Sequence, residues 1–300
     1  VESRGLGDVY KRQVQDMSFA LVLGGGGSVG VAWEVGVLAG LAEAGIDPTA
    51  AELVVGTSAG SVVGTHVRQG RSIEQLVANQ REPDGGSGVE PMKTDLTPLI
   101  EIFAALREAQ ERTPEVLREV GRTAIAADTP PESAWIGRFE RIVGGGEWPE
   151  GDLRITAVDC ATGLRRVWTA GDGVDLARAV ASSCAIPGVV PPITLDGSRY
   201  TDGGLWSSSN LDVVLDSDVD AAIFVGPLRV GDPSAVRALE RESELLASTG
   251  RRVEAIVPGE AFTTEIGAQN LMNPAFRNRG VELGIEDGAA AAARVRAIVG

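Results

Sequence analysis

A Gly-x-Ser-x-Gly turn in the sequence has the residue types that nucleophilic chemistry needs. Gly56, Ser58 and Gly60 stand between a short apolar run and a segment with helical character. A turn of this kind holds its serine in strained backbone geometry and admits only small neighbours. The helix that follows would point its amino terminus at the serine, where free amides favour developing negative charge. This context favours a nucleophile at Ser58 over a plain Gly/Ser turn.

A serine nucleophile needs a base, and the usual base is histidine. The only histidine, His66, follows Ser58 by eight residues on the predicted helix, which places it roughly 12 Å further along the axis. We therefore predict a structural role for His66 and exclude a Ser-His-Asp triad. Asp202 is the best placed carboxylate, because it stands at the exit of a predicted strand. The glycines that follow it, Gly203 and Gly204, let neighbouring backbone approach closely. Asp-Gly alone is more often an ordinary turn, but the serine turn and the missing histidine favour Asp202 as the base.

A glycine loop after the first apolar run is the candidate oxyanion hole. Gly25, Gly26, Gly27 and Ser28 offer unencumbered amides that could face the serine. Such amides, aimed at a tetrahedral intermediate, commonly contribute a few kcal/mol each. A carboxyl with an ordinary pKa near 4 is poorly matched to a serine hydroxyl. We therefore expect Asp202 to lie in an apolar pocket that raises its pKa.

The same loop also fits a dinucleotide fingerprint, Gly25-x-Gly27-x-x-Gly30, which makes a Rossmann-type binding module the chief alternative. That fingerprint requires an acidic residue at the end of the second strand to bind the ribose. Here the second strand ends in the serine turn, and the nearby acidic residues Asp47 and Glu52 precede it. The dinucleotide alternative is therefore weak.

The elements around these motifs predict an α/β fold. Two successive strand-to-helix units begin at residues 18 and 53, and such units form parallel sheets with right-handed crossovers. Residues 81–150 read as a helical insertion, with helices within 97–120. The remaining predicted elements are hairpins over 153–158 with 164–169 and over 191–195 with 198–201, helices over 174–183, 233–249 and 287–299, and strands over 221–225 and 253–257.

No linker divides the chain, so we predict one α/β domain over residues 17–300 that includes the helical insertion. Residues 1–16 show neither helical nor strand periodicity. We expect this segment to be disordered or extraneous, with the native start at Met17.

Charge and cysteine content narrow the partners and the compartment. The formal net charge of −15 repels polyanions, so we expect no nucleic-acid partner. No basic cluster suits docking on anionic lipid, and any membrane contact should be transient and apolar. Cys160 and Cys184 are too few for a disulfide framework or a thiolate metal cage, which favours a reducing cytoplasm. No segment reaches the roughly eighteen apolar residues of a membrane span.

The glycine loop, Gly-Thr-Ser-Ala-Gly and Asp-Gly-Gly follow one another in an order that resembles the patatin-like phospholipases. Residues 181–187, Ala-Ser-Ser-Cys-Ala-Ile-Pro, are similar to the family's segment between nucleophile and aspartate. The resemblance covers roughly Met17 to the carboxyl terminus. It implies a three-layer α/β/α fold with a mostly parallel sheet, a Ser58-Asp202 dyad, and acyl hydrolysis without metal or cofactor on glycerophospholipid or neutral lipid substrates.

One residue departs from the family pattern. The family often has Arg or Lys before the last glycine of its oxyanion loop, whereas this chain has Val29. Ester hydrolysis is therefore a firmer expectation than a preference for phospholipids. A catalytically weak regulatory protein with the same fold is the second alternative.

Overall fold

The computed structural model describes residues 17–86, 112–227 and 233–300, with a few further residues between 97 and 106. Residues 1–16, where we expect disorder or extraneous sequence, lie outside the described residues. The strands are β1 (Phe19–Leu23), β2 (Leu53–Gly56), β3 (Asp152–Asp159), β4 (Arg165–Trp168), β5 (Ile193–Leu195), β6 (Ser198–Asp202), β7 (Ala221–Val225) and β8 (Arg252–Ile256).

The longer helices connect and follow these strands. They are α2 (Gly27–Glu43), α3 (Ala59–Arg68), α4 (Ile73–Arg81), α6 (Pro114–Ala126), α7 (Glu132–Val143), α8 (Leu176–Ser183), α9 (Pro233–Ser248), α10 (Glu260–Glu265) and α11 (Arg277–Val299).

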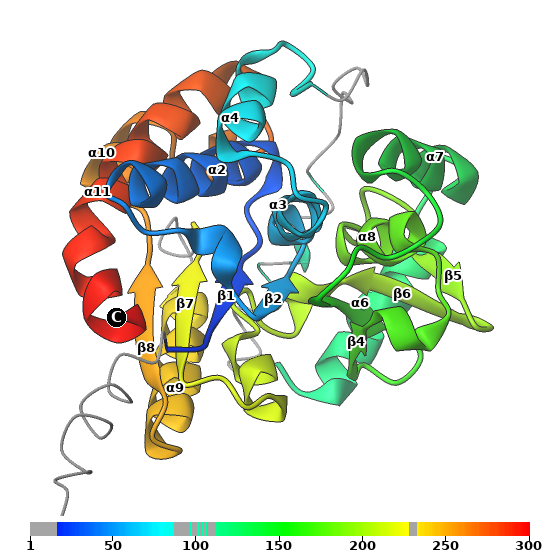
Figure 1. The fold of residues 1–300 in the computed structure, drawn as a ribbon. Coiled ribbons are helices and arrows are strands. Elements are labelled where there is room, and N and C mark those ends of the chain that lie inside the picture. Colours follow the sequence, from blue (N-terminus) through cyan, green and yellow to red (C-terminus); the bar gives the residue numbers. More distant parts are fainter. Residues whose placement is uncertain are drawn as a thin grey trace, which may run out of the picture.

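The strands form one sheet in the order β5-β6-β3-β2-β1-β7-β8, with β4 paired to β3 (Figure 1). Five strands, β3, β2, β1, β7 and β8, are mutually parallel. The β3–β4 and β5–β6 pairs are antiparallel, which confirms both predicted hairpins. Asp196 and Gly197 form the tight turn of the second hairpin with positive φ at both residues.

Alternation along β1 shows why helices cover both faces of the sheet. Phe19, Leu21 and Leu23 belong to the larger core, which includes side chains of α2, α3 and α11. Ala20 and Val22 point the opposite way, into a second core that includes side chains of α9. Because successive strand residues point to opposite faces, a strand buried on both sides is apolar throughout. The three-layer α/β/α fold with a mostly parallel sheet is thus confirmed.

Helix α2 packs very closely on α11 through glycines. A Cβ added at Gly284 would lie 2.2 Å from the carbonyl oxygen of Trp33, and one added at Gly36 would lie 2.3 Å from that of Val281. The predicted start of the last helix at residue 287 is wrong, because α11 begins at Arg277. Its glycines, which suggest a loop in the sequence, are the places where the two helices touch.

The described part of the predicted insertion contains helices α6 and α7. Much of the segment 97–111 lies outside the described residues. Helix α7 packs its buried face, which includes Trp135 and Phe139, against the larger core. The insertion thus contributes a wall beside α3.

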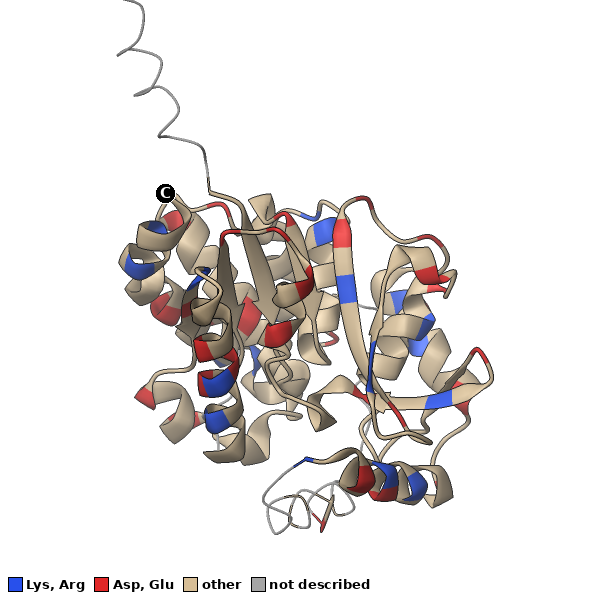
Figure 2. Cartoon of the chain, turned by 90° about the horizontal axis from the view of Figure 1, so that it is seen from below, with Lys and Arg blue, Asp and Glu red and all other residues tan. Residues whose placement is uncertain are grey.

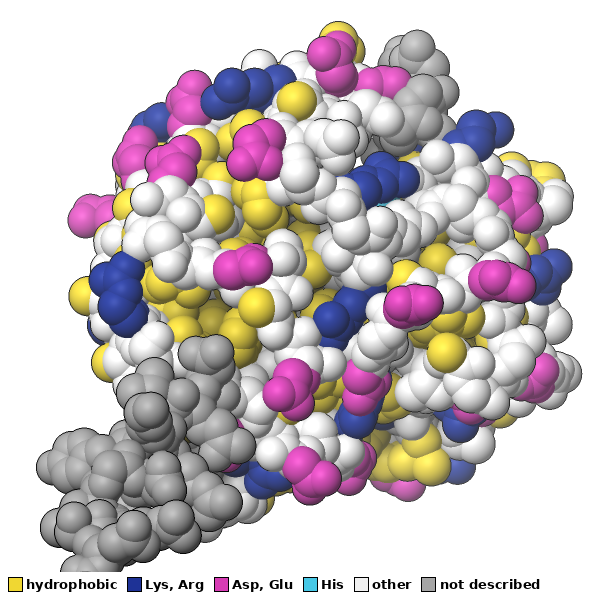
Figure 3. All heavy atoms as spheres, viewed as in Figure 1, with side chains coloured by type: hydrophobic (Ala, Val, Ile, Leu, Met, Phe, Trp, Pro, Cys, Tyr) yellow, Lys and Arg dark blue, Asp and Glu magenta, His cyan; other side chains and the backbone are white. Residues whose placement is uncertain are grey.

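Acidic and basic residues are interspersed over the described part of the chain, as Figure 2 shows, rather than gathered on one basic face. On the face in Figure 3, hydrophobic side chains show between charged ones. The large hydrophobic side chains that are strongly exposed among the described residues are Ile125, Leu164 and Leu245. No helix in the described part of the chain has the length and apolar character needed to cross a bilayer.

Candidate active site

Ser58 occupies the sharp turn between β2 and α3. It is one of three non-glycine residues with positive φ among the described residues, at φ 52° and ψ −114°. Glycine is required on both sides, because a Cβ at Gly56 would lie 2.5 Å from Ser61 Cα and one at Gly60 would lie 2.2 Å from the Leu23 carbonyl oxygen. A strained residue that is supported this closely is typical of functional sites.

The backbone of Ser58 is held on both sides of its α-carbon. Its N–H donates to Ser183 Oγ at 2.8 Å. Its carbonyl oxygen accepts from Ser61 Oγ at 2.6 Å and from Cys184 Sγ at 3.2 Å. These bonds offset the cost of the positive φ and fix the direction of the side chain. The sequence did not reveal these roles of Ser183 and Cys184, because the two residues are remote in the chain.

Asp202 ends β6 and is only 9% exposed. Its Oδ1 accepts a hydrogen bond from the Gly204 amide at 2.8 Å. Burial raises the pKa of Asp202 to about 6, while hydrogen bonds from Gly204 and from the Ser58 side chain act in the opposite direction. The direction agrees with the expectation from the sequence. At Gly203 an added Cβ would lie 2.3 Å from Thr156 Oγ1, so the base also sits in a turn that only glycine permits.

One short segment contacts both residues of the candidate dyad. Ser183 and Cys184 bond to Ser58 as described above. The next carbonyl, of Ala185, accepts from the backbone N–H of Asp202 at 3.0 Å and from Thr201 Oγ1 at 2.6 Å. The Ala-Ser-Ser-Cys-Ala-Ile-Pro motif therefore has a physical function, which is to bring the serine turn and the aspartate strand together.

Asn210 connects the same two turns from the other side. Its Nδ2 donates to Thr57 Oγ1 at 3.1 Å and to the Gly203 carbonyl at 3.3 Å, so it touches the neighbours of both Ser58 and Asp202. It is fully buried and has φ 47°. Sequence reasoning missed it. The available signal was an asparagine, a residue that tolerates positive φ, at the end of the turn after Asp-Gly-Gly.

The glycine loop lies beside the serine. A Cβ added at Gly25 would lie 3.5 Å from Ser58 Cβ. The amide of Gly25 already donates to the Ser208 carbonyl at 3.3 Å, so it is not available as the oxyanion donor that we expected. Among the residues that the structure describes, none accepts a hydrogen bond from the backbone N–H of Gly26, Gly27 or Ser28. The backbone amides of Gly26, Gly27 and Ser28 are therefore the remaining candidates for the expected oxyanion hole.

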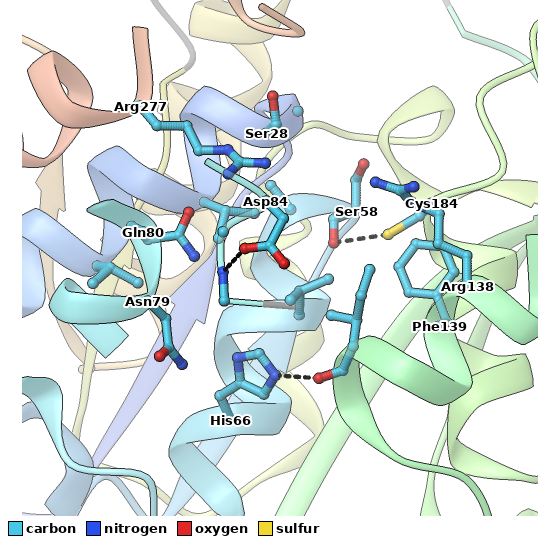
Figure 4. A pocket seen from close by; sticks show the side chains of 18 of the residues that line it. Ser28, Ser58, His66, Asn79, Gln80, Asp84, Arg138, Phe139, Cys184 and Arg277 are labelled. Carbon is cyan, nitrogen blue, oxygen red and sulfur yellow. Dashed lines mark hydrogen bonds between the residues drawn. The ribbon is translucent and has the colours of Figure 1, made fainter. Parts of the chain in front are cut away.

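A cavity of about 160 Å³ opens over Ser58 and is walled by helices α2, α3, α4 and α7 (Figure 4). Gly27 and Ser28 line it beside the serine. Arg138 and Arg277 also line it, and Arg277 donates to the Glu82 and Pro83 carbonyls.

His66 lines the same cavity, eight residues along α3 from Ser58. Its Nε2 pairs with the Ile142 carbonyl at 3.0 Å, which is the structural role predicted for it. Burial, with a smaller contribution from the charge of Arg71, lowers its pKa to about 4, so the ring is neutral at physiological pH. The structure adds what the sequence did not reveal, which is that this ring is part of the cavity wall.

Comparison with known proteins gives one family match. The sequence model of a family described as patatin-like phospholipase matches residues 21–215. A search of curated proteins finds no match. Among solved structures, the chain is similar to VipD from Legionella pneumophila, with TM-score 0.46 and 12% identity over 92% of this chain and 67% of VipD. It is similar to the type III effector protein ExoU with TM-score 0.36 and 16% identity, over 91% of this chain and 54% of ExoU.

Proposed function

The chain belongs to the patatin-like phospholipase family, whose sequence model matches more than half of it, and we therefore propose that it is a serine hydrolase of lipid acyl esters. Ser58 is the nucleophile of this proposal and Asp202 is its base. The observation that carries the proposal is the pairing of a strained serine, at the amino end of a helix, with a buried carboxyl whose strand is bonded to the same short segment, Ser183–Ala185, that holds the serine.

The proposed reaction proceeds in two steps. With its pKa near 6, Asp202 is ionised at neutral pH and can take the proton from Ser58 as the serine oxygen attacks the ester carbonyl. The amides of Gly26, Gly27 and Ser28 stabilise the negative charge on the carbonyl oxygen. Asp202 then returns the proton to the leaving alcohol, and a water molecule hydrolyses the acyl-enzyme with Asp202 again as base.

The surroundings of Ser58 support an acyl group as the recognised part of the substrate. About half of the side chains in the cavity wall are apolar, and most of the apolar ones come from α2, α3, α4 and α7. Val29 is fully buried and supplies no charge at the place where many family members have a cation. We propose that the ester and its acyl chain, rather than a phosphate contact in the glycine loop, dominate recognition.

Labelling with a fluorophosphonate tests the proposal directly, because this probe reacts only with a serine that has both an activating base and an oxyanion hole. We expect one label per chain, mapped by peptide mass to the segment that contains Ser58, and no label in Ser58→Ala. A folded sample that takes up no label would instead favour a regulatory protein of the same fold. A dinucleotide-binding module would show a higher melting temperature with NAD(P). We expect no such increase for this protein.

A further inference from the structure

Ser58, which precedes the first residue of α3, and two residues of that helix define the direction in which the cavity runs. Ser58, Val62 and His66 follow one another at intervals of four and all line the cavity. Residues four apart lie on the same face of a helix. The cavity therefore follows α3 from the nucleophile to His66, which is about 12 Å at 1.5 Å per residue. Figure 4 shows the His66 ring at the opposite end of this face from Ser58.

The walls along this path carry apolar side chains at helical intervals, while Asn79, Gln80, Asp84, Arg138 and Arg277 line other parts of the same cavity. The side chains that line the path come from α2, α4 and α7, and each helix contributes one face. They are Val31 and Val35 from α2, Leu76 from α4, and Trp135, Phe139 and Ile142 from α7. A hydrocarbon chain that leaves the Ser58 carbonyl centre along α3 would contact these faces for most of its length.

The apolar side chains along α3 end at His66. The ring is fixed by its bond to the Ile142 carbonyl, and the next lining residue, Arg71, is a half-buried cation whose backbone N–H donates to the His66 carbonyl at 3.2 Å. A hydrocarbon tail that continued past His66 would remove water from the Arg71 guanidinium without replacing its hydrogen bonds. Desolvating a charge in this way is costly.

We propose that this cavity is an acyl-chain ruler, with His66 as its far end, that selects esters of medium-chain acids. The proposal rests on the proposed function, since it takes Ser58 as the point where the acyl group is held. With bonds near 1.5 Å and roughly tetrahedral angles, an extended chain advances about 1.3 Å per carbon, so about 12 Å accommodates about eight to ten carbons. Shorter chains leave apolar wall uncovered, and longer chains meet His66 and Arg71.

The test is a chain-length profile of kcat/KM on p-nitrophenyl esters from two to sixteen carbons, all below their critical micelle concentrations. We expect the wild-type optimum at eight to ten carbons. His66→Ala should move the optimum about two to four carbons longer, because it removes the end wall. Val62→Phe fills the cavity about 6 Å from Ser58, one helical turn along, and should move the optimum to about four carbons or fewer.

Val67→Ala is the matched control. Val67 lies on the same helix next to His66 and is 5% exposed, but it does not line the cavity. Its truncation should lower the melting temperature without changing the optimal chain length. An equal shift of the optimum in Val67→Ala and His66→Ala would mean that the helix has merely loosened, which would overturn the ruler.

The experiments can reject the proposed acyl-chain ruler and the proposed hydrolase activity independently of each other. If hydrolysis requires Ser58 but the optimum is the same in wild type, His66→Ala and Val62→Phe, the ruler is wrong and the hydrolase stands. If wild type cleaves none of the esters, the hydrolase is wrong, and the ruler is then decided by the melting-temperature shifts that fatty acids of four to sixteen carbons cause. A maximum at eight to ten carbons that moves in His66→Ala supports the ruler, and a flat profile rejects it.

Discussion

The backbone N–H of Ser58 donates a hydrogen bond to the hydroxyl of Ser183 at 2.8 Å, so the candidate nucleophile is anchored by a residue 125 positions away. Ser183→Ala would leave this amide without its acceptor beside a strained φ. An unsatisfied buried group costs about 1–3 kcal/mol. We expect kcat to fall about 10- to 100-fold with little change in KM, measured by steady-state hydrolysis of a p-nitrophenyl ester.

Ser182→Ala is the matched control for this prediction. Ser182 is also fully buried on α8, but its hydroxyl donates to the Ala179 carbonyl and accepts from the Trp168 indole, away from the serine turn. It should lower the melting temperature and leave kcat nearly unchanged. If both variants lose kcat equally, the loss would reflect a general weakening of α8 and not the anchoring of Ser58.

Removal of either dyad side chain should almost abolish hydrolysis. Ser58→Ala removes the nucleophile and Asp202→Asn removes the base, and each should lower kcat by at least about 1000-fold. Both variants should keep the far-UV circular dichroism spectrum of the wild type. Full activity in either one, measured with the same ester, would rule out the dyad.

Activity should rise with pH as Asp202 loses its proton. Because burial raises the pKa of Asp202 to about 6, the base is mostly protonated at pH 5 and mostly ionised at pH 7. We expect kcat/KM to increase between these values with a midpoint near 6 and then to level off. A profile that is flat from pH 5 to 8 would be inconsistent with Asp202 as the base.

The same shift predicts a stability cost of the ionised base. The pKa of Asp202 is raised from 3.8 to about 6, so the folded state binds this proton more tightly than the unfolded state. Stability from this group is fully present below pH 4 and is lost as pH rises through 6. The loss is on the order of 3 kcal/mol, from 1.36 kcal/mol per pKa unit.

Asp202→Asn should therefore be more stable than wild type at pH 8 and about equally stable at pH 4, measured by urea unfolding at both values. Glu34 is also buried with a raised pKa, but it is present in both proteins, so its contribution cancels. A variant that is less stable than wild type at pH 8 would contradict the predicted cost.

Asn210 offers a test of the link between the two turns. Asn210→Ala would lose the bonds to Thr57 and Gly203 and would place alanine, which tolerates positive φ less well than asparagine, at φ 47°. We expect a loss of about 2–4 kcal/mol in unfolding free energy, together with a large fall in kcat.

Asn210→Gly separates strain from hydrogen bonding, because glycine adopts positive φ without cost. It should recover part of the stability but not kcat, since the bonds to both turns stay broken. Recovery of full kcat in Asn210→Gly would show that the link itself is not needed for catalysis.

Local sequence patterns predicted most of the fold because each strand carries its own signal. Strand β7 begins and ends where its apolar run does, and the Asp196-Gly197 turn identifies the second hairpin. The start of α11 could not be predicted in this way. Its glycines are unfavourable in an isolated helix, and only the contact with α2, far away in the sequence, explains them.

The residues of the candidate site also differ in whether a local sequence signal identifies them. Ser58 and Asp202 could be proposed because each stands in a short turn whose glycines are adjacent in sequence. Asn210 and Ser183 could not, because their importance lies in hydrogen bonds to residues more than a hundred positions away. The occupied amide of Gly25 is a further example, since its partner belongs to the loop after Gly203.

The contact between the start of α2 and Leu271 connects the candidate site to a part of the chain beyond the family match. The Val29 amide and the Ser28 hydroxyl both donate to the Leu271 carbonyl, at 2.9 Å and 3.4 Å. Leu271 lies 56 positions beyond the last residue of the family match, 215. A fragment cut at that boundary would retain Ser58 and Asp202 but lose the Leu271 carbonyl that fixes the start of α2 beside the candidate oxyanion amides. The chain beyond residue 215 therefore helps to hold the candidate site in place, although the family match does not cover it.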